Sequence, residues 1–135
     1  MASHGYEEVD HTADVALKVW GEDFQTLLSQ AAEGLYALMN VESSLNAPVE
    51  TSFVLPVGSY EDFLVDFLNE LLYLLEEKGQ KLSNFAFTEY EDRLEIKAMG
   101  EEAQSQDRYI KAVTFHNLNV EKSDRGLEVI ITFDV

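Results

Sequence analysis

Polar side chains crowd together just before the first predicted strand, in the segment Asp10-His11-Thr12-Ala13-Asp14. Two carboxylates, an imidazole and a hydroxyl fall within these few residues, where a loop enters a strand. Such positions hold functional groups in fixed geometry, which favours a role in binding or catalysis. The alternative is turn chemistry, in which Asp and Thr side chains satisfy backbone amides and nothing is bound.

A second candidate site is the end of the sequence, Phe133-Asp134-Val135. If the native chain ends here, the carboxylate of Asp134 and the terminal carboxylate of Val135 lie side by side. Two such anions repel each other unless a cation lies between them. A hard divalent ion with oxygen ligands (Mg²⁺, Mn²⁺ or Ca²⁺) would relieve the repulsion, and Asp14 would suit such a site as a third carboxylate. The alternative is a frayed, solvated terminus.

A third candidate is the strand-like stretch 110–117, which carries Lys111, Thr114 and His116 among apolar residues. These three side chains need polar partners if they face inward. Considered alone, His116 fits a hydrogen-bonded core histidine better than a ligand.

Two amphipathic helices and several strands must position these residues. Residues 15–20 alternate between apolar and other side chains, which predicts a strand that ends at Gly21. Asp23 can cap a helix that stops near Asn40, and Ser59 can cap a second helix that ends at Gly79. The apolar stripe of the second helix is the wider one, so we expect it to be covered on more than one side.

The remaining strands are short. Residues 41–51 are predicted to be a connection, followed by a short strand over 53–57. Two hairpins are predicted, one from strands 85–90 and 94–98, the other from strands 118–121 and 127–133, with an exposed loop over 101–107. This order predicts an α+β fold in which two amphipathic helices pack on a largely antiparallel β-sheet. Residues 1–135 are expected to form a single domain.

Composition excludes several functions. The 26 acidic residues outnumber the 9 Lys and Arg, which gives a net charge of −17 and argues against a direct grip on nucleic-acid phosphates. The absence of cysteine excludes thiolate chemistry and Cys-ligated metals. We find no phosphate-binding glycine loop, nucleophile elbow or zinc-protease motif. With no signal-peptide pattern or membrane-length apolar run either, the expected protein has no membrane association and is cytoplasmic.

Together with the helix run 65–76, the segments 10–15, 110–118 and 133–135 resemble the archease family. They occur in the family's order and span nearly the whole chain. Archeases are accessory proteins of the RtcB-type tRNA-splicing RNA ligase and promote its guanylylation by GTP and its multiple turnover. The resemblance implies a metal site formed by Asp14, Asp134 and Val135. Two positions depart from the family pattern: Phe115, where Tyr is common, and Val135, where Ile is common.

The resemblance predicts an activator of an RNA ligase, not an enzyme, that meets tRNA only through the ligase. His11, Lys111 and His116 are candidates for acting on that partner. The alternative is an acidic, chaperone-like modulator of RNA-processing enzymes such as tRNA methyltransferases, which would not depend on a metal. A metal-dependent hydrolase fits least, because no general base near the predicted ion can be identified. The activator hypothesis requires the first acidic loop and the last two residues to share one pocket.

Overall fold

A computed structural model describes residues 3–9 and 15–135 of the chain, which contain two helices and nine strands. The helices are α1 (Phe24–Met39) and α2 (Tyr60–Lys78). The strands are β1 (Gly5–Val9), β2 (Val15–Gly21), β3 (Glu42–Ser43), β4 (Val49–Pro56), β5 (Gln80–Glu89), β6 (Arg93–Ser105), β7 (Ala112–Thr114), β8 (Glu121–Ser123) and β9 (Gly126–Asp134).

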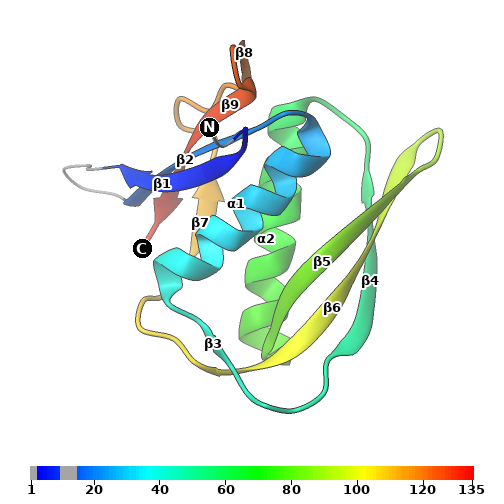
Figure 1. Cartoon of the computed structure of the whole chain (residues 1–135), viewed down its shortest axis with the longest axis vertical. Coiled ribbons are helices and arrows are strands. Elements are labelled where there is room, and N and C mark those ends of the chain that lie inside the picture. The colour runs from blue at the N-terminus through cyan, green and yellow to red at the C-terminus, as the bar shows by residue number, and fades with distance from the viewer. Residues whose placement is uncertain (1–2, 10–14) are drawn as a thin grey trace.

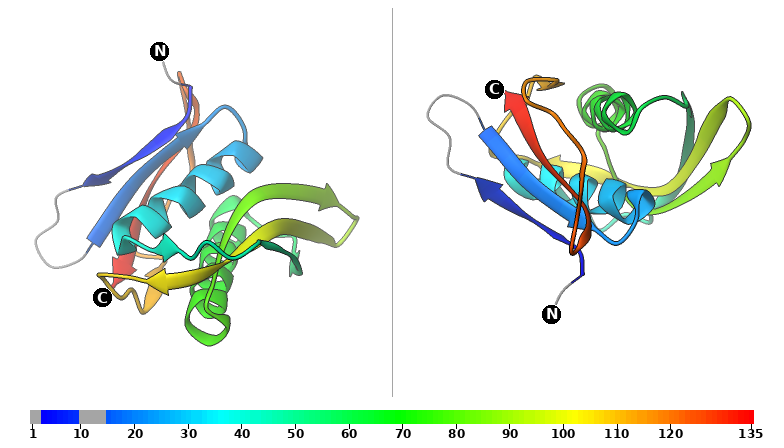
Figure 2. Two further views of the ribbon diagram at one scale, coloured as in Figure 1. Left: turned by 60° about the horizontal axis from the view of Figure 1, so that its bottom comes forward. Right: turned by 90° about the horizontal axis from the view of Figure 1, so that it is seen from above.

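The strands form two sheets, in which every described pairing is antiparallel. A five-stranded sheet has the order β1-β2-β9-β7, with β8 pairing with β9. In the four-stranded sheet, β6 pairs with β3, β4 and β5. The two helices lie between the sheets (Figures 1 and 2). The predicted α+β class is therefore confirmed, although the strands divide over two sheets instead of joining one.

Both helices pack against strands of both sheets. α1 contacts β1, β2, β9 and β5, whereas α2 contacts β7, β4 and β5, and the helices contact each other. Phe67 of α2 is fully buried, and its ring lies 5.4 Å from that of Phe85 and 6.3 Å from that of Phe53. Covering on more than one side explains the wide apolar stripe of α2.

The helix ends follow the capping residues predicted from the sequence. The carboxylate of Asp23 accepts a hydrogen bond from the Thr26 amide at 2.8 Å, which fixes the start of α1. The Ser59 hydroxyl accepts one from the Asp62 amide at 3.0 Å at the start of α2. Asn40 ends α1 at a φ of 50°, in the left-handed conformation common at helix C-termini.

The prediction of an exposed loop over 101–107 is wrong, because β6 continues to Ser105. This part of β6 pairs with β3 and with the start of β5 through backbone hydrogen bonds, which polar residues make as well as apolar ones. The connection predicted over 41–51 likewise contains β3 and the start of β4.

Strand boundaries also differ near the two ends of the sequence. Residues 5–9, predicted as a polar start, form β1 at the edge of the five-stranded sheet. Within the strand-like stretch 110–117, only Ala112–Thr114 is a strand. The last hairpin is present, but its first strand is Glu121–Ser123 and not 118–121.

Candidate metal and partner-binding site

Parts of two predicted functional segments, 110–117 and 133–135, meet at one end of the five-stranded sheet, beside the start of β2. Val15, the first residue of β2, is the register partner of Phe133 in β9. Ala112 of β7 is the register partner of Asp134, and the Lys111 amide donates a hydrogen bond to the Asp134 carbonyl at 2.8 Å. The start of β2, the start of β7 and the end of β9 therefore form one tip of the sheet. We call it the β9 tip (Figure 1).

The side chain of Asp134 at the β9 tip is open to solvent. Phe133 is fully buried, and side chains alternate between the two faces of a strand, so Asp134 belongs to the face opposite the core. Val135 follows it and is half-exposed. The carboxylate of Asp134 can consequently reach an ion or another molecule without any rearrangement of the core.

Helix α2 fixes the position of β7 through a residue that the sequence reasoning did not single out. The Val113 amide donates to the side-chain oxygen of Asn69 at 3.1 Å. Further along, the Val120 amide donates to the carboxylate of Glu61 at 2.7 Å. The sequence offers one signal for Asn69, namely that it is a polar residue beside the apolar stripe of a predicted helix. Its role depends on the position of β7, which the pattern of α2 does not reveal.

Two of the partner-activation candidates, Lys111 and His116, do not share the β9 tip. Lys111 lies at the β9 tip and is exposed. β7 runs from Ala112, beside Asp134, to Thr114, beside Thr132, so it carries the chain away from the tip before His116. The imidazole of His116 is exposed, and its Nε2 lies 3.2 Å from the Asn117 side-chain amide. His11 lies outside the described residues, as does Asp14.

The predicted metal site is only partly within the described chain. Among residues 3–9 and 15–135, no group of three or more His, Asp or Glu side chains is arranged to hold a metal. The described donors are the carboxylate of Asp134 and, in a chain that ends at Val135, the terminal carboxylate. Oxygen donors of this kind suit Mg²⁺, Mn²⁺ or Ca²⁺. The chemistry of the donors fits the predicted ion, and the site stays a prediction.

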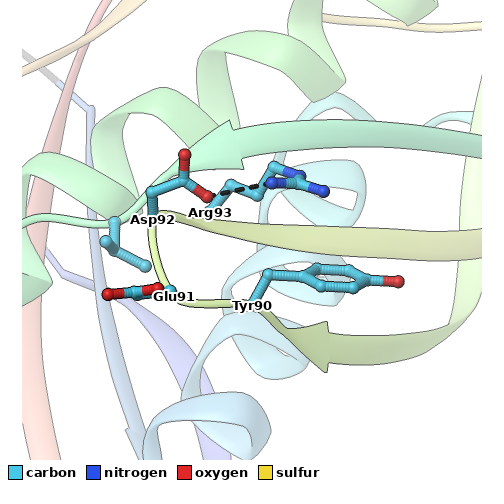
Figure 3. Close-up of a pocket in the computed structure, with 5 residues that line it drawn as sticks. Tyr90, Glu91, Asp92 and Arg93 are labelled. Carbon is cyan, nitrogen blue, oxygen red and sulfur yellow. Dashed lines mark hydrogen bonds and ion pairs between the residues drawn. The ribbon is translucent and has the colours of Figure 1, made fainter.

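A hollow at the β5–β6 turn is drawn in Figure 3, and Figures 1 and 2 show that this turn lies far from the β9 tip. It measures about 820 Å³ and is lined by the turn residues 90–93 and by Val57. Arg93 forms an ion pair with Asp92 at 2.9 Å, and its guanidinium lies 4.6 Å from the centre of the Tyr90 ring. All five lining side chains are exposed, and none of them is a predicted site residue.

Comparison with known proteins identifies the family. The archease protein family matches residues 6–135, and the chain therefore belongs to it. The protein archease of Methanopyrus kandleri is 32% identical over 127 residues, which cover 88% of this chain and 91% of that protein. The protein archease of Methanosarcina mazei is 31% identical, with complete coverage of both chains.

Solved structures show the same fold. The solution structure of protein 1598 from Methanobacterium thermoautotrophicum has a TM-score of 0.74 at 24% identity and covers 97% of this chain and 99% of its own. The crystal structure of a Thermotoga maritima archease, described there as a possible chaperone, has a TM-score of 0.71 at 23% identity, with 96% of each chain covered. Neither helix of the described chain is long and apolar enough to cross a membrane.

Proposed function

We propose that this protein activates an RtcB-type RNA ligase in tRNA splicing. It would promote the metal-dependent guanylylation of the ligase by GTP, and thereby multiple turnover, in the cytoplasm. On this hypothesis it is not itself an enzyme, and it meets tRNA only through the ligase. Family membership supports the proposal, because ligase activation is what the archease resemblance implies.

The observation that supports the proposal is the strand pairing at the β9 tip. Asp14 directly precedes Val15 in the chain, and Asp134 directly follows Phe133. Since Val15 and Phe133 are register partners, the strand that begins after Asp14 starts next to the strand that ends in Asp134. The block that contains Lys111 joins the same tip through its backbone hydrogen bond.

Each residue has a definite part in this hypothesis. Asp14, Asp134 and the carboxylate of Val135 would hold a divalent ion, which would neutralise charge on the triphosphate of GTP in the ligase. Lys111 presents a cation at the same tip and is suited to contact a phosphate or a carboxylate of the partner. The chain has only 9 Lys and Arg against 26 Asp and Glu, and this excess of negative charge suits docking against a basic protein.

The test is a guanylylation assay of a cognate ligase at limiting GTP, with and without this protein. We expect faster guanylylation with the wild-type chain. Asp14→Ala and Asp134→Asn should abolish the stimulation, because each removes one anionic ligand. Asp134 is exposed, so its replacement should change the free energy of unfolding by less than about 0.5 kcal/mol.

Asp124→Asn is a matched control, since it removes the same charge at an exposed turn between β8 and β9. It should stimulate normally. Wild-type-like stimulation by Asp14→Ala or Asp134→Asn would overturn the assigned roles.

The second candidate is an acidic, chaperone-like modulator of RNA-processing enzymes such as tRNA methyltransferases. The net charge of −17 would suffice for it. The Thermotoga maritima relative is described as a possible chaperone, which is in line with this candidate. It predicts an effect on the partner that Asp14→Ala and Asp134→Asn leave unchanged, whereas the activator hypothesis predicts that these variants lose the effect.

A further inference from the structure

A cavity of about 370 Å³ lies beside the β9 tip, between the end of α2 and the segment 106–111. We call it the α2 pocket. Its floor is apolar and buried, formed mainly by Leu72, Leu75 and Ile110. Glu76, Tyr109 and Lys111 are exposed and form the rim. Its volume falls in the lower part of the range for pockets that bind ligands, about 300–1,000 Å³.

The wall opposite α2 is held in place at both ends. The Asp107 amide donates to the Met39 carbonyl at 2.9 Å, which attaches the segment to the end of α1. The Lys111 amide donates to the Asp134 carbonyl at 2.8 Å, which attaches it to the β9 tip. Around the first of these attachments, the Gln106 side-chain amide donates to the Arg108 carbonyl at 3.1 Å. The pocket is thus formed before anything binds, which lowers the entropic cost of binding.

The surface around the pocket combines exposed aromatic rings with negative charge. Tyr109 is 73% exposed, and Tyr73, on the solvent face of α2, is 51% exposed. Tyr73 lies within one helical turn of Glu70, Glu76 and Glu77, so these side chains share one face. Tyrosine is enriched at protein interfaces, and burying it against a partner removes more apolar area from water than burying a small residue does.

We propose that the α2 pocket docks a basic segment of the partner protein, with one aliphatic or aromatic side chain of that segment in the pocket. The apolar floor selects the inserted side chain. The acidic face of α2 selects the Lys or Arg residues that flank it, and repels an acidic segment. Lys111 links the pocket to the β9 tip, so one partner can occupy both. The partner's identity as the ligase rests on the proposed function.

The pocket and the β9 tip should then have separable tasks. Changes of the rim residues Glu76 and Tyr109 should weaken binding and leave the maximal stimulation intact when the protein is saturating. Changes of the ion ligands should leave binding nearly intact and abolish stimulation. This difference distinguishes a docking surface from the site that acts on guanylylation.

The experiment measures the dissociation constant for the ligase by calorimetry and the guanylylation rate across a range of protein concentrations. The test variant is the double substitution Glu76→Lys and Tyr109→Ala. Both side chains are exposed, so the variant should keep the wild-type melting temperature. Glu91→Lys is the control, because it makes the same charge reversal at the exposed β5–β6 turn.

We expect the double variant to bind the ligase at least about tenfold more weakly, with full stimulation restored at high concentration, and the control to bind normally. Asp134→Asn should bind within about twofold of wild type and fail to stimulate. Normal binding by the double variant would overturn the docking role while leaving the proposed function in place. A wild-type chain that neither binds nor stimulates the ligase would overturn both.

Discussion

At the scale of single residues, the backbone contacts of the β9 tip explain how exposed side chains are held in place. Asp134 and Lys111 are both exposed, but their main chains are joined by a hydrogen bond between β9 and the segment before β7. Phe133 anchors the tip in the core. Functional groups on a rigid frame of this kind stay near one geometry without burial of their charges.

Extending the chain beyond Val135 tests the part of the proposed site that is not a side chain. In a chain that ends at Val135, a C-terminal tag converts the terminal carboxylate into a peptide amide, which removes one anionic ligand of the proposed site. We expect the affinity for a divalent ion and the stimulation of the ligase to fall, as measured by calorimetry and the guanylylation assay. A chain tagged at its N-terminus is the control, and equal activity of the two would contradict the ligand role of Val135.

Tyr36 provides a residue-scale test of the core. Its hydroxyl is buried and accepts a hydrogen bond from the Leu82 amide at 3.0 Å. Tyr36→Phe leaves this buried donor without its partner, which should cost about 1–3 kcal/mol of the free energy of unfolding. Urea denaturation measures the change, and a loss well below 0.5 kcal/mol, roughly the level of a neutral surface substitution, would contradict the structural role.

The same residue predicts a dependence of stability on alkaline pH. Burial raises the pKa of Tyr36 to about 12 from the ordinary 10.0, against a smaller opposing effect of the Leu82 hydrogen bond. Between these values the unfolded chain loses the proton first, so the contribution of Tyr36 to stability is complete below pH 10 and falls as pH rises toward 12. Tyr36→Phe should lack this component in denaturation measured across the same pH range.

At the scale of elements, the helices were easier to predict than the strands. The caps at Asp23, Asn40, Ser59 and Gly79 are local signals, since each acts on the few residues next to it. β1 and the end of β6 carry charged residues on exposed faces, so their sequences lack the alternation of apolar and polar residues that predicts a strand. They are strands because their backbones pair with neighbouring strands. Propensity and periodicity therefore could not detect them.

The candidate site likewise contains residues that the sequence predicted and contacts that it could not reveal. The sequence predicted Asp134 as an ion ligand and Lys111 as a residue that acts on the partner, but it did not predict that the two are neighbours. The strand register places both at the β9 tip. The roles of Asn69 and Glu61 depend on which backbone amides lie opposite α2. Those contacts come from the tertiary packing, so a local pattern could not reveal them. The position of Asp14 stays a prediction.

Two glycines have a positive φ, one in a tight turn and one at the end of a helix, and their replacement by alanine should destabilise the fold to different extents. Gly126 has a φ of 102°, and a Cβ there would meet the main chain of residues 21 and 22. Gly79 has a φ of 65° with no atom within 4 Å of the added Cβ. We expect Gly79→Ala to cost about 1–2 kcal/mol from backbone strain alone, and Gly126→Ala to cost clearly more. Thermal denaturation of both variants gives the comparison, and an equal cost would contradict it.

At the scale of the whole molecule, the net charge of −17 has two opposite consequences. Mutual repulsion destabilises the folded chain, whereas attraction to a basic partner speeds association. Both depend on ionic strength, because salt shortens the range of charge interactions. On the acidic face of α2, Glu70, Glu76 and Glu77 repel one another and would also attract a basic partner.

Raising the NaCl concentration from about 0.01 M to about 1 M shortens the Debye length from about 30 Å to about 3 Å. We expect the melting temperature of the free protein to rise, because repulsion is screened, and the association rate with the ligase to fall. Calorimetry and stopped-flow measurements check the two effects. A melting temperature that falls, or an association rate that does not respond to salt, would contradict this account.

The pairing of β2 with β9 joins strands from near the two ends of the sequence. Few contacts in a protein span so much chain, and closing so long a loop is entropically costly before any pairing rewards it. In the sheet, β9 lies between β2 and β7, so each of these strands has an unpaired edge in any state in which β9 has not yet paired. We therefore expect the β9 tip to be assembled late in folding, and a molecule arrested before that step to expose strand edges that can pair with a neighbouring chain.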